Sequence, residues 1–256
     1  MVGRLWLNEL TRDEVRDLAP DATVVLPVAS TEQHGPHLPL KTDSALAEAV
    51  AFRAARAAAE SVPVVVAPVL PYGCSHHHLV YCALSLSSGT LIAVLNDLAD
   101  SLVASGFRRI FFLNSHGGND EVIKLLAKDL VLRHPIAVAA CAYWQVGEAA
   151  VKATAAVDLV KSPGHSGAFE TAMMMAAAPD LVRTDRIPEK RADLPAFWAR
   201  GIAPGLMVQK AGEWERIGGY TDEPALATPE KGRLLLEAMS MAVAGAIVAF
   251  HRESFR

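Results

Sequence analysis

The sequence predicts an α/β fold built around a mainly parallel β-sheet that helices cover on both faces. Four short apolar segments alternate with helical segments, at 23–28, 64–69, 109–114 and 136–141. A strand–helix alternation of this kind is typical of parallel sheets. The segments are continuously apolar, as expected of strands that are buried on both faces. In such sheets ligands bind beyond the carboxyl ends of the strands.

Each connecting segment has its own helical signal. Residues 44–60 are rich in alanine, with apolar positions at helical spacing. A second helix is expected after Gly89-Thr90, and Gly106 is expected to end it. The third helix, 120–134, follows the loop Ser-His-Gly-Gly-Asn directly.

The second half of the chain is less regular. Residues 145–228 contain one clear helix, at 168–178, and a last long helix begins at Pro229. The apolar stretch at 234–250 contains a glutamate, a serine and a glycine, and we expect it to fall short of a bilayer span. The chain has no internal repeat and no linker, so we expect a single domain over 1–256.

Composition excludes several functional classes. The 24 lysines and arginines against 28 acidic residues give a net charge of −4, without the basic surplus of a nucleic-acid-binding protein. The three cysteines are scattered, which argues against a disulfide framework or a cysteine zinc site. The N-terminus does not resemble a signal peptide. We therefore expect a cytoplasmic protein without nucleic-acid or membrane partners.

The polar residues that carry chemistry follow the predicted strands. Three of these segments together hold carboxylates and imidazoles, namely Glu32, His34, Asp43, His116 and Glu170. Oxygen and nitrogen donors without thiolate suit Zn²⁺, Mn²⁺ or a related ion in hydrolysis. Five such residues exceed what one catalytic ion needs, and they suit a pair of ions that share a bridging carboxylate. Each segment alone is a weak signal, and their combination favours metal-dependent hydrolysis.

Longer strings around these residues resemble the creatininase (creatinine amidohydrolase) family. They are STEQHGPHLPL at 30–40 with Thr42-Asp43, NSHGGN at 114–119, GHSGAFET at 164–171 and GGYTDEPALATPEKG at 218–232. The resemblance extends over about residues 5–250. It implies a three-layer α/β/α fold, a two-metal centre and hydrolysis of non-peptide amide C–N bonds. It also implies a homo-oligomer, with a hexamer as the common form in the family.

The resemblance assigns roles to individual residues. Glu32, His34, Asp43, His116 and Glu170 match the metal ligands, with Asp43 as the bridge, and the cofactors are two divalent ions (Zn²⁺, Mn²⁺ or both, with Fe²⁺ as a further option). His165 matches the histidine that handles the proton. The residues expected at the substrate are Ser75, His78, Gly117, Gly118 and Trp144. Three consecutive histidines follow the second strand, and of these we expect His78 to face the substrate. The N–H groups of the two glycines would stabilise an oxyanion.

Two departures from true creatininase bear on the substrate. Gly118 stands where that enzyme has a further glutamate, and a second tryptophan expected before His165 is absent around 161–163. These departures argue against creatinine itself. The Gly-Gly form occurs in relatives that resemble the formylamide hydrolase of archaeal flavin biosynthesis and the mycofactocin-precursor peptidase. The substrate is therefore expected to be a small cyclic amide or a formamide, with the peptidase as the alternative.

Two other classes are weighed against this interpretation. A serine hydrolase is disfavoured because the chain has no G-x-S-x-G nucleophile elbow. A non-catalytic metal-binding relative is disfavoured because all five ligand candidates are present.

The loops at 143–163 and 183–228 are expected to line the substrate pocket. We expect water activated by the ions to attack an amide carbonyl, and His165 to protonate the leaving nitrogen.

Overall fold

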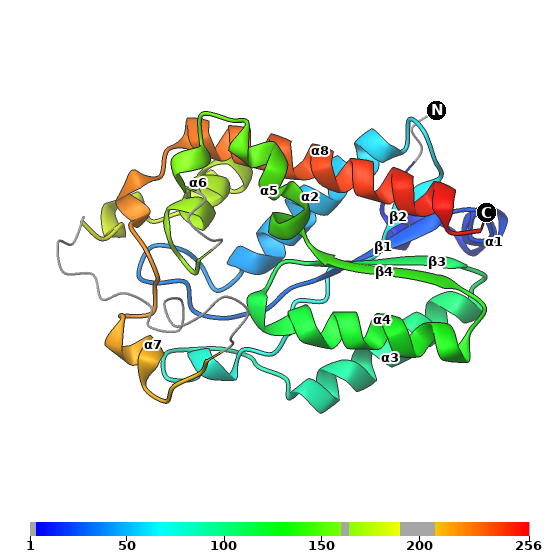
Figure 1. Cartoon of the computed structure of the whole chain (residues 1–256), viewed down its shortest axis with the longest axis horizontal. Helices are drawn as coiled ribbons and strands as arrows, with labels where there is room; N and C mark the ends of the chain where they lie inside the picture. Colours follow the sequence, from blue (N-terminus) through cyan, green and yellow to red (C-terminus); the bar gives the residue numbers. More distant parts are fainter. Residues whose placement is uncertain (1–3, 160–163, 190–207, 256) are drawn as a thin grey trace.

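A computed structural model describes residues 4–159, 164–189 and 208–255 of the chain (Figure 1). Its strands are β1 (Thr23–Val28), β2 (Val64–Val66), β3 (Arg109–Asn114) and β4 (Ala137–Ala142). Its helices are α1 (Arg12–Leu18), α2 (Thr42–Ala58), α3 (Ser88–Ala104), α4 (Asp120–Arg133), α5 (Tyr143–Lys152), α6 (Ala168–Ala177), α7 (Glu213–Arg216) and α8 (Pro229–Glu253).

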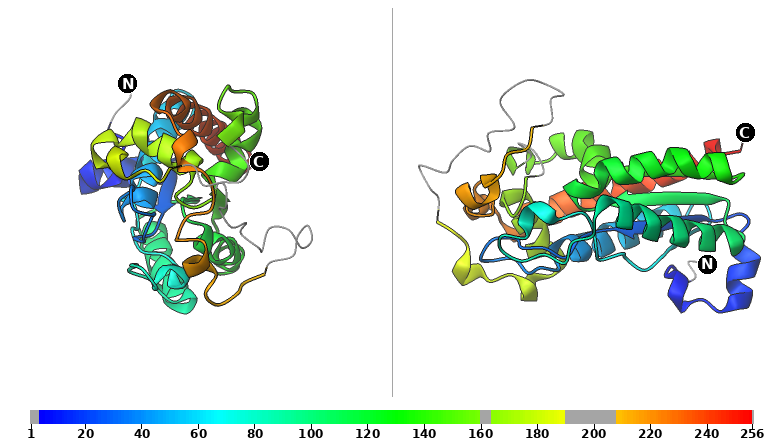
Figure 2. Two further views of the ribbon diagram at one scale, coloured as in Figure 1. Left: turned by 90° about the vertical axis from the view of Figure 1, so that its left-hand side faces the viewer. Right: turned by 90° about the horizontal axis from the view of Figure 1, so that it is seen from below.

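The four strands form one parallel sheet in the order β2-β1-β3-β4. Thr23 at the start of β1 lies beside Val64 of β2 and Arg109 of β3, so the strands are in register at their first residues. Helices α3 and α4 cover one face of the sheet, while α2 and α8 cover the other (Figures 1 and 2). This confirms the predicted three-layer α/β/α fold.

The two faces of the sheet enter two separate hydrophobic cores. Val25 and Phe111 point toward the core that α2, α6 and α8 share. Their chain neighbours Val24 and Phe112 point toward the core formed with α3 and α4. Because successive side chains of a strand point to opposite faces, a strand between two helical layers has to be apolar at every position. The continuous apolar segments of the sequence reflect this demand.

Some elements differ from the sequence-based expectation. The second strand ends at Val66 rather than at residue 69, and Pro68 follows where a strand would need a backbone N–H donor. Helix α5 lies in a region predicted to be irregular. Gly106 ends α3 as predicted, with a φ of +99° that favours glycine.

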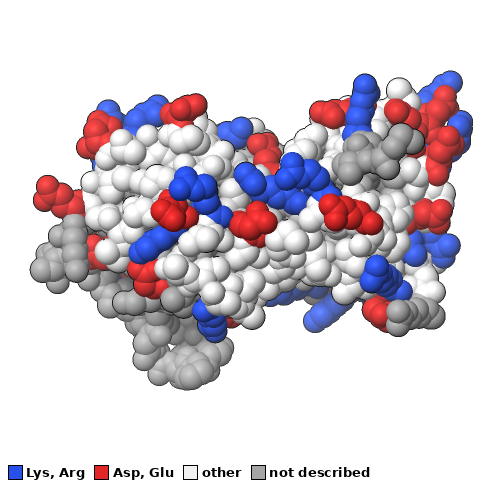
Figure 3. Space-filling view, turned by 90° about the horizontal axis from the view of Figure 1, so that it is seen from above, with Lys and Arg blue, Asp and Glu red and all other residues white. Residues whose placement is uncertain are grey.

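Helix α8 is the longest helix and meets the length and composition of a membrane span, because an 18-residue window within it has a mean hydropathy of 1.8. This corrects the expectation that the stretch at 234–250 is too short. In the structure α8 packs along α2, α5 and α6 and buries Leu235, Met239 and Val243. One side of α8 thus lies in the core of the protein, and 39% of its apolar window is buried. The face of the molecule seen in Figure 3 carries basic and acidic side chains interspersed.

Candidate metal centre

The five predicted ligand residues meet at the carboxyl end of the sheet. Glu32 and His34 follow β1, and His116 follows β3. Asp43 and Glu170 stand in the first turns of α2 and α6. All five side chains are buried, with exposed fractions between 0% and 8%. The parallel topology explains the convergence, because strands that run in one direction deliver their following loops to the same edge.

The first ligand group contains His34, Asp43 and Glu170. The Nε2 atom of His34 lies 3.2 Å from Asp43 Oδ1 and 3.7 Å from Glu170 Oε2. The backbone N–H of Ser166 donates to Glu170 Oε2 at 2.5 Å and fixes that carboxylate. Ser166 reaches this position with a φ of 51°, in the left-handed region that residues other than glycine rarely adopt.

The second ligand group contains Glu32, His116 and the other oxygen of Asp43. The Nδ1 atom of His116 lies 3.2 Å from Glu32 Oε1 and 3.2 Å from Asp43 Oδ2. Asp43 therefore faces one group with Oδ1 and the other group with Oδ2. This is the geometry of a carboxylate that bridges two ions, the role that the resemblance implies for it.

Backbone carbonyl groups set the tautomers of both ligand histidines. His34 donates its Nδ1–H to the carbonyl oxygen of Glu32 at 3.1 Å, which leaves the Nε2 lone pair facing the carboxylates. His116 donates its Nε2–H to the carbonyl oxygen of Cys74 at 3.0 Å, which leaves its Nδ1 lone pair toward Glu32 and Asp43. A carbonyl that accepts the distal N–H is the usual support of a metal-binding histidine.

The arrangement fits divalent ions. Several buried ligand-type atoms have no hydrogen-bond partner among the described residues, including both carboxylate oxygens of Glu32, His34 Nε2 and Asp43 Oδ2. Such orphaned buried groups are costly unless an ion or water satisfies them. The 3.2 Å separations within each group also match the distance of about 3.4 Å between the ligands of one tetrahedral zinc ion.

The electrostatics of the centre point in the same direction. Burial alone would lower the pKa of His34, but Asp43, Glu170 and Glu32 outweigh it and raise that pKa to about 9. Burial, together with the Asp43 charge, raises the pKa of Glu170 to about 8. Burial opposes the protonated form of His116 too, yet Glu32 and Asp43 hold its pKa well above the usual value. Three buried carboxylates thus attract positive charge, which protons or metal ions can supply.

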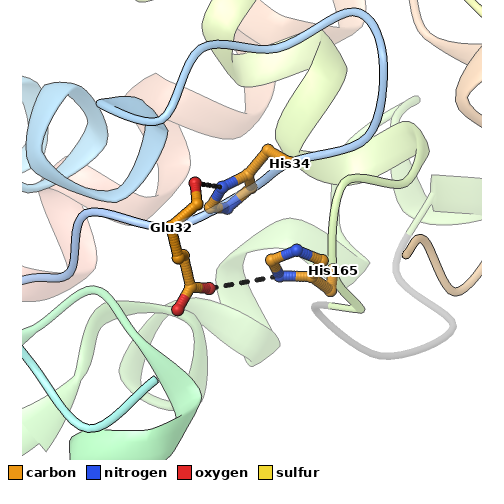
Figure 4. Close-up of side chains that lie close together, drawn as sticks. All are labelled: Glu32, His34 and His165. Atoms are coloured by element: carbon orange, nitrogen blue, oxygen red, sulfur yellow. Dashed lines mark hydrogen bonds and ion pairs between the residues drawn. The ribbon is translucent and has the colours of Figure 1, made fainter. Parts of the chain in front are cut away.

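His165 lies against the same cluster (Figure 4). Its Nε2–H donates to the carbonyl oxygen of Gln33 at 2.7 Å, so its Nδ1 lone pair faces Glu32 Oε1 at 3.4 Å. Burial and the nearby His34 and His78 lower the pKa of His165 well below the usual value, which keeps the ring neutral. The Glu170 carboxylate is oriented by the backbone N–H of Ser166.

Gln33 is a site residue that the sequence interpretation missed. Its side-chain amide nitrogen lies 3.0 Å from His78 Nδ1, 3.0 Å from His165 Nε2 and 2.9 Å from the carbonyl oxygen of Gly219. Because His165 Nε2 carries a proton in the tautomer given above, the amide N–H groups of Gln33 donate to His78 and to Gly219, and they tie His78 to the loop before α8. The sequence signal that could have identified Gln33 is its position between Glu32 and His34, because a residue between two ligands is well placed to orient neighbouring side chains.

A cavity of about 600 Å³ opens above the cluster. Of the residues predicted to contact substrate, His78, Gly117, Gly118 and Trp144 line it. Ser75 is fully buried behind His116, with its hydroxyl 3.3 Å from His116 Nε2. Trp214 also lines the cavity and was not predicted; its ring lies 4.3 Å from the ring of His78. Residues 160–163 and 190–207 of the loops expected to line the pocket lie outside the described residues.

Comparison with known proteins identifies the family. The family model described as creatinine amidohydrolase matches residues 8–247. This chain belongs to the creatininase family. The creatinine amidohydrolase of Pseudomonas putida is 30% identical over 279 residues, covering 100% of this chain and 99% of the relative. The mycofactocin precursor peptide peptidase of Mycobacterium tuberculosis is also 30% identical, over 91% of this chain and 86% of the relative.

Solved structures agree with this assignment. A mutant creatininase described as the Zn–Zn type superimposes with a TM-score of 0.77 at 28% identity, over 96% of this chain and 97% of its own. Family membership and the clustered ligand residues make this creatininase-family protein a metal-dependent amidohydrolase.

The close packing around position 118 leaves room for glycine alone beside the centre. A Cβ atom at Gly118 would lie 2.1 Å from the carbonyl oxygen of Cys74 and 2.7 Å from His116 Nε2. That carbonyl sets the tautomer of His116, so the backbone geometry of the ligand requires glycine here. No side chain at position 118 can therefore contribute to the centre without displacing this contact.

Proposed function

We propose that this protein hydrolyses the amide bond of a small cyclic amide or a formamide at a pair of divalent ions. The observation that carries the proposal is the position of Asp43. Its two oxygens each face a different ligand group, and each group contains buried ligand atoms that have no hydrogen-bond partner among the described residues. A single ion would bind to one of these groups and leave the buried carboxylate and imidazole atoms of the other group without a partner.

The donor set supports Zn²⁺, Mn²⁺ or one of each, with Fe²⁺ as a further option. Glu32, His116 and Asp43 would hold one ion, while His34, Glu170 and Asp43 would hold the other. Divalent ions in such a pair lower the pKa of water and polarise the amide carbonyl. The carbonyls of Glu32 and Cys74 accept the distal N–H of each ring, so the nitrogen that faces the ions is the one that releases its proton on coordination.

His165 is our candidate for proton transfer. Its neutral ring presents the Nδ1 lone pair to the cluster, and the Gln33 carbonyl holds the opposite N–H. In this role Nδ1 accepts the proton that the attacking water releases and then donates it to the amide nitrogen as the C–N bond breaks. The backbone N–H groups of Gly117 and Gly118 would stabilise the oxyanion, a role that the position of both residues at the cavity wall supports.

A peptidase activity is the second candidate function. It is favoured by the relative from Mycobacterium tuberculosis, whose identity to this chain equals that of the creatinine amidohydrolase. The two candidates differ in whether the scissile bond is a peptide bond. We also propose a homo-oligomer, with a hexamer as the first option, and a cytoplasmic location without nucleic-acid or membrane partners.

The test combines metal content with a substrate panel. Protein purified without chelator is subjected to elemental analysis and assayed on creatinine, other cyclic amides, formamides and short peptides, before and after EDTA. We expect nearly two ions per chain and chelator-sensitive hydrolysis of a cyclic amide or a formamide. Hydrolysis of peptides alone would favour the peptidase. The control variant His134→Ala should retain two ions and full activity. The same result for His116→Ala would refute the assigned centre.

A further inference from the structure

An imidazole beside the second ligand group has no role in the centre described above. His77 lies on the turn His76–His78, and one of its ring nitrogens lies within 4.8 Å of ligand atoms of both Glu32 and His116. Its side chain is half-buried at the cavity wall. Among the described residues, none forms a hydrogen bond with either nitrogen of this ring. A donor atom thus stands next to the cluster without a protein partner there.

Packing holds this ring close to the ligand histidine. The rings of His77 and His116 are nearly parallel, 6° apart in plane, with centroids separated by 5.8 Å. The neighbouring ring of His78 lies 4.2 Å away, and Trp214 lies 5.2 Å away on the cavity side. A ring confined by three aromatic neighbours has few alternative rotamers, which favours a fixed ligand.

The second ligand group has few donors of its own, and position 118 of the loop that carries His116 cannot add another. Glu32 and His116 share Asp43 with the first group, so they bring just two donors of their own. Position 118, on the loop that carries His116, has no room for a side chain. Another loop can supply an additional ligand instead: the turn that carries His77 follows β2 and brings a ring nitrogen close to Glu32 and His116.

We propose that His77 is a protein ligand of the ion held by Glu32 and His116. The inference rests on the proposed function, because it requires that ions bind at the cluster. The second ion then has two imidazoles and two carboxylates, whereas the first has one imidazole and two carboxylates. Because imidazole suits Zn²⁺ and carboxylates suit Mn²⁺, the second position selects Zn²⁺ more strongly than the first.

The experiment measures ion binding directly. Metal-free wild type, His77→Ala and His76→Ala are titrated with Zn²⁺ against a competing chelator and with Co²⁺ by visible absorption. His76 is the matched control, since it is one residue away and exposed, and its Nδ1 atom forms a hydrogen bond with the Ser85 hydroxyl at 2.9 Å. We expect two ions in wild type and in His76→Ala. In His77→Ala the first ion should be retained and the second weakened at least 10-fold, with an altered Co²⁺ spectrum.

A second variant covers the case in which His77→Ala does not fold. His77→Glu offers a carboxylate instead, and it should restore the second ion with a preference shifted toward Mn²⁺. Two ions with wild-type affinities and an unchanged Co²⁺ spectrum in His77→Ala, or an unchanged Zn²⁺/Mn²⁺ preference in His77→Glu, would overturn the ligand role alone. A wild type that binds no ion would overturn the proposed function as well, so the two failures are distinguishable.

Discussion

Removal of the ions should make the stability of the protein fall steeply with rising pH. In the metal-free fold the pKa of His34 is about 9 against 6.5 for a free histidine. The stability contributed by this proton is complete below pH 6.5 and is lost as pH rises through 9. Glu170 acts with the same sign, because its pKa of about 8 lies above the ordinary 4.5 and the folded state binds a proton that the unfolded chain has released.

The size of the effect follows from these values. Between pH 7 and pH 9 the loss is about 2 kcal/mol from His34 and about 1 kcal/mol from Glu170, or about 3 kcal/mol together. His116 adds a loss of the same sign, because its pKa is also raised in the fold. The depressed pKa of His165 and of His78 contributes little here, because both rings are neutral in either state above pH 7. For a chain of this size about 3 kcal/mol corresponds to a fall in Tm of about 6–12 °C.

The assay compares thermal unfolding of chelated and Zn²⁺-loaded protein at pH 7, 8 and 9. Bound ions keep both groups deprotonated and ligated, so the loaded protein should show no such fall, and the difference in Tm should widen with pH. Glu170→Gln should flatten the metal-free curve, whereas the surface variant Glu148→Gln should not. Parallel curves for the chelated and loaded wild type between pH 7 and 9 would refute the electrostatic argument.

Other predictions concern single residues. Glu32→Gln should lose tight binding of one ion and at least about 10³-fold in kcat with an unchanged circular dichroism spectrum; full activity would remove Glu32 from the centre. His165→Ala should retain both ions and lose about 10²–10⁴-fold in kcat, and an unchanged kcat would make the residue structural. Gly118→Ala should weaken Zn²⁺ binding about 10–100-fold, because its Cβ displaces the carbonyl that orients His116. Gly117→Ala, whose Cβ meets nothing within 4 Å, should bind Zn²⁺ normally in the same chelator competition, and equal losses would contradict the steric explanation.

The predictable part of the fold was the part encoded in local patterns. Four apolar segments indicated four strands, and the structure has them within a few residues. Helix α1 was missed although Thr11 and Glu14 form a capping box that signals a helix start. Helix α5 was harder to predict because Gly147 lowers helical propensity. Its packing against Met239 of α8 is a tertiary contact that outweighs this cost.

The sequence by itself determined which residue types stand at the strand ends, and parallel topology then requires them to meet at one edge. It did not determine how they meet. The division of the Asp43 oxygens between two groups, the contact of His165 with Glu32 and the approach of His77 from another loop depend on loop paths and rotamers. Those are fixed by packing between segments far apart in the chain, so only the tertiary structure decided them.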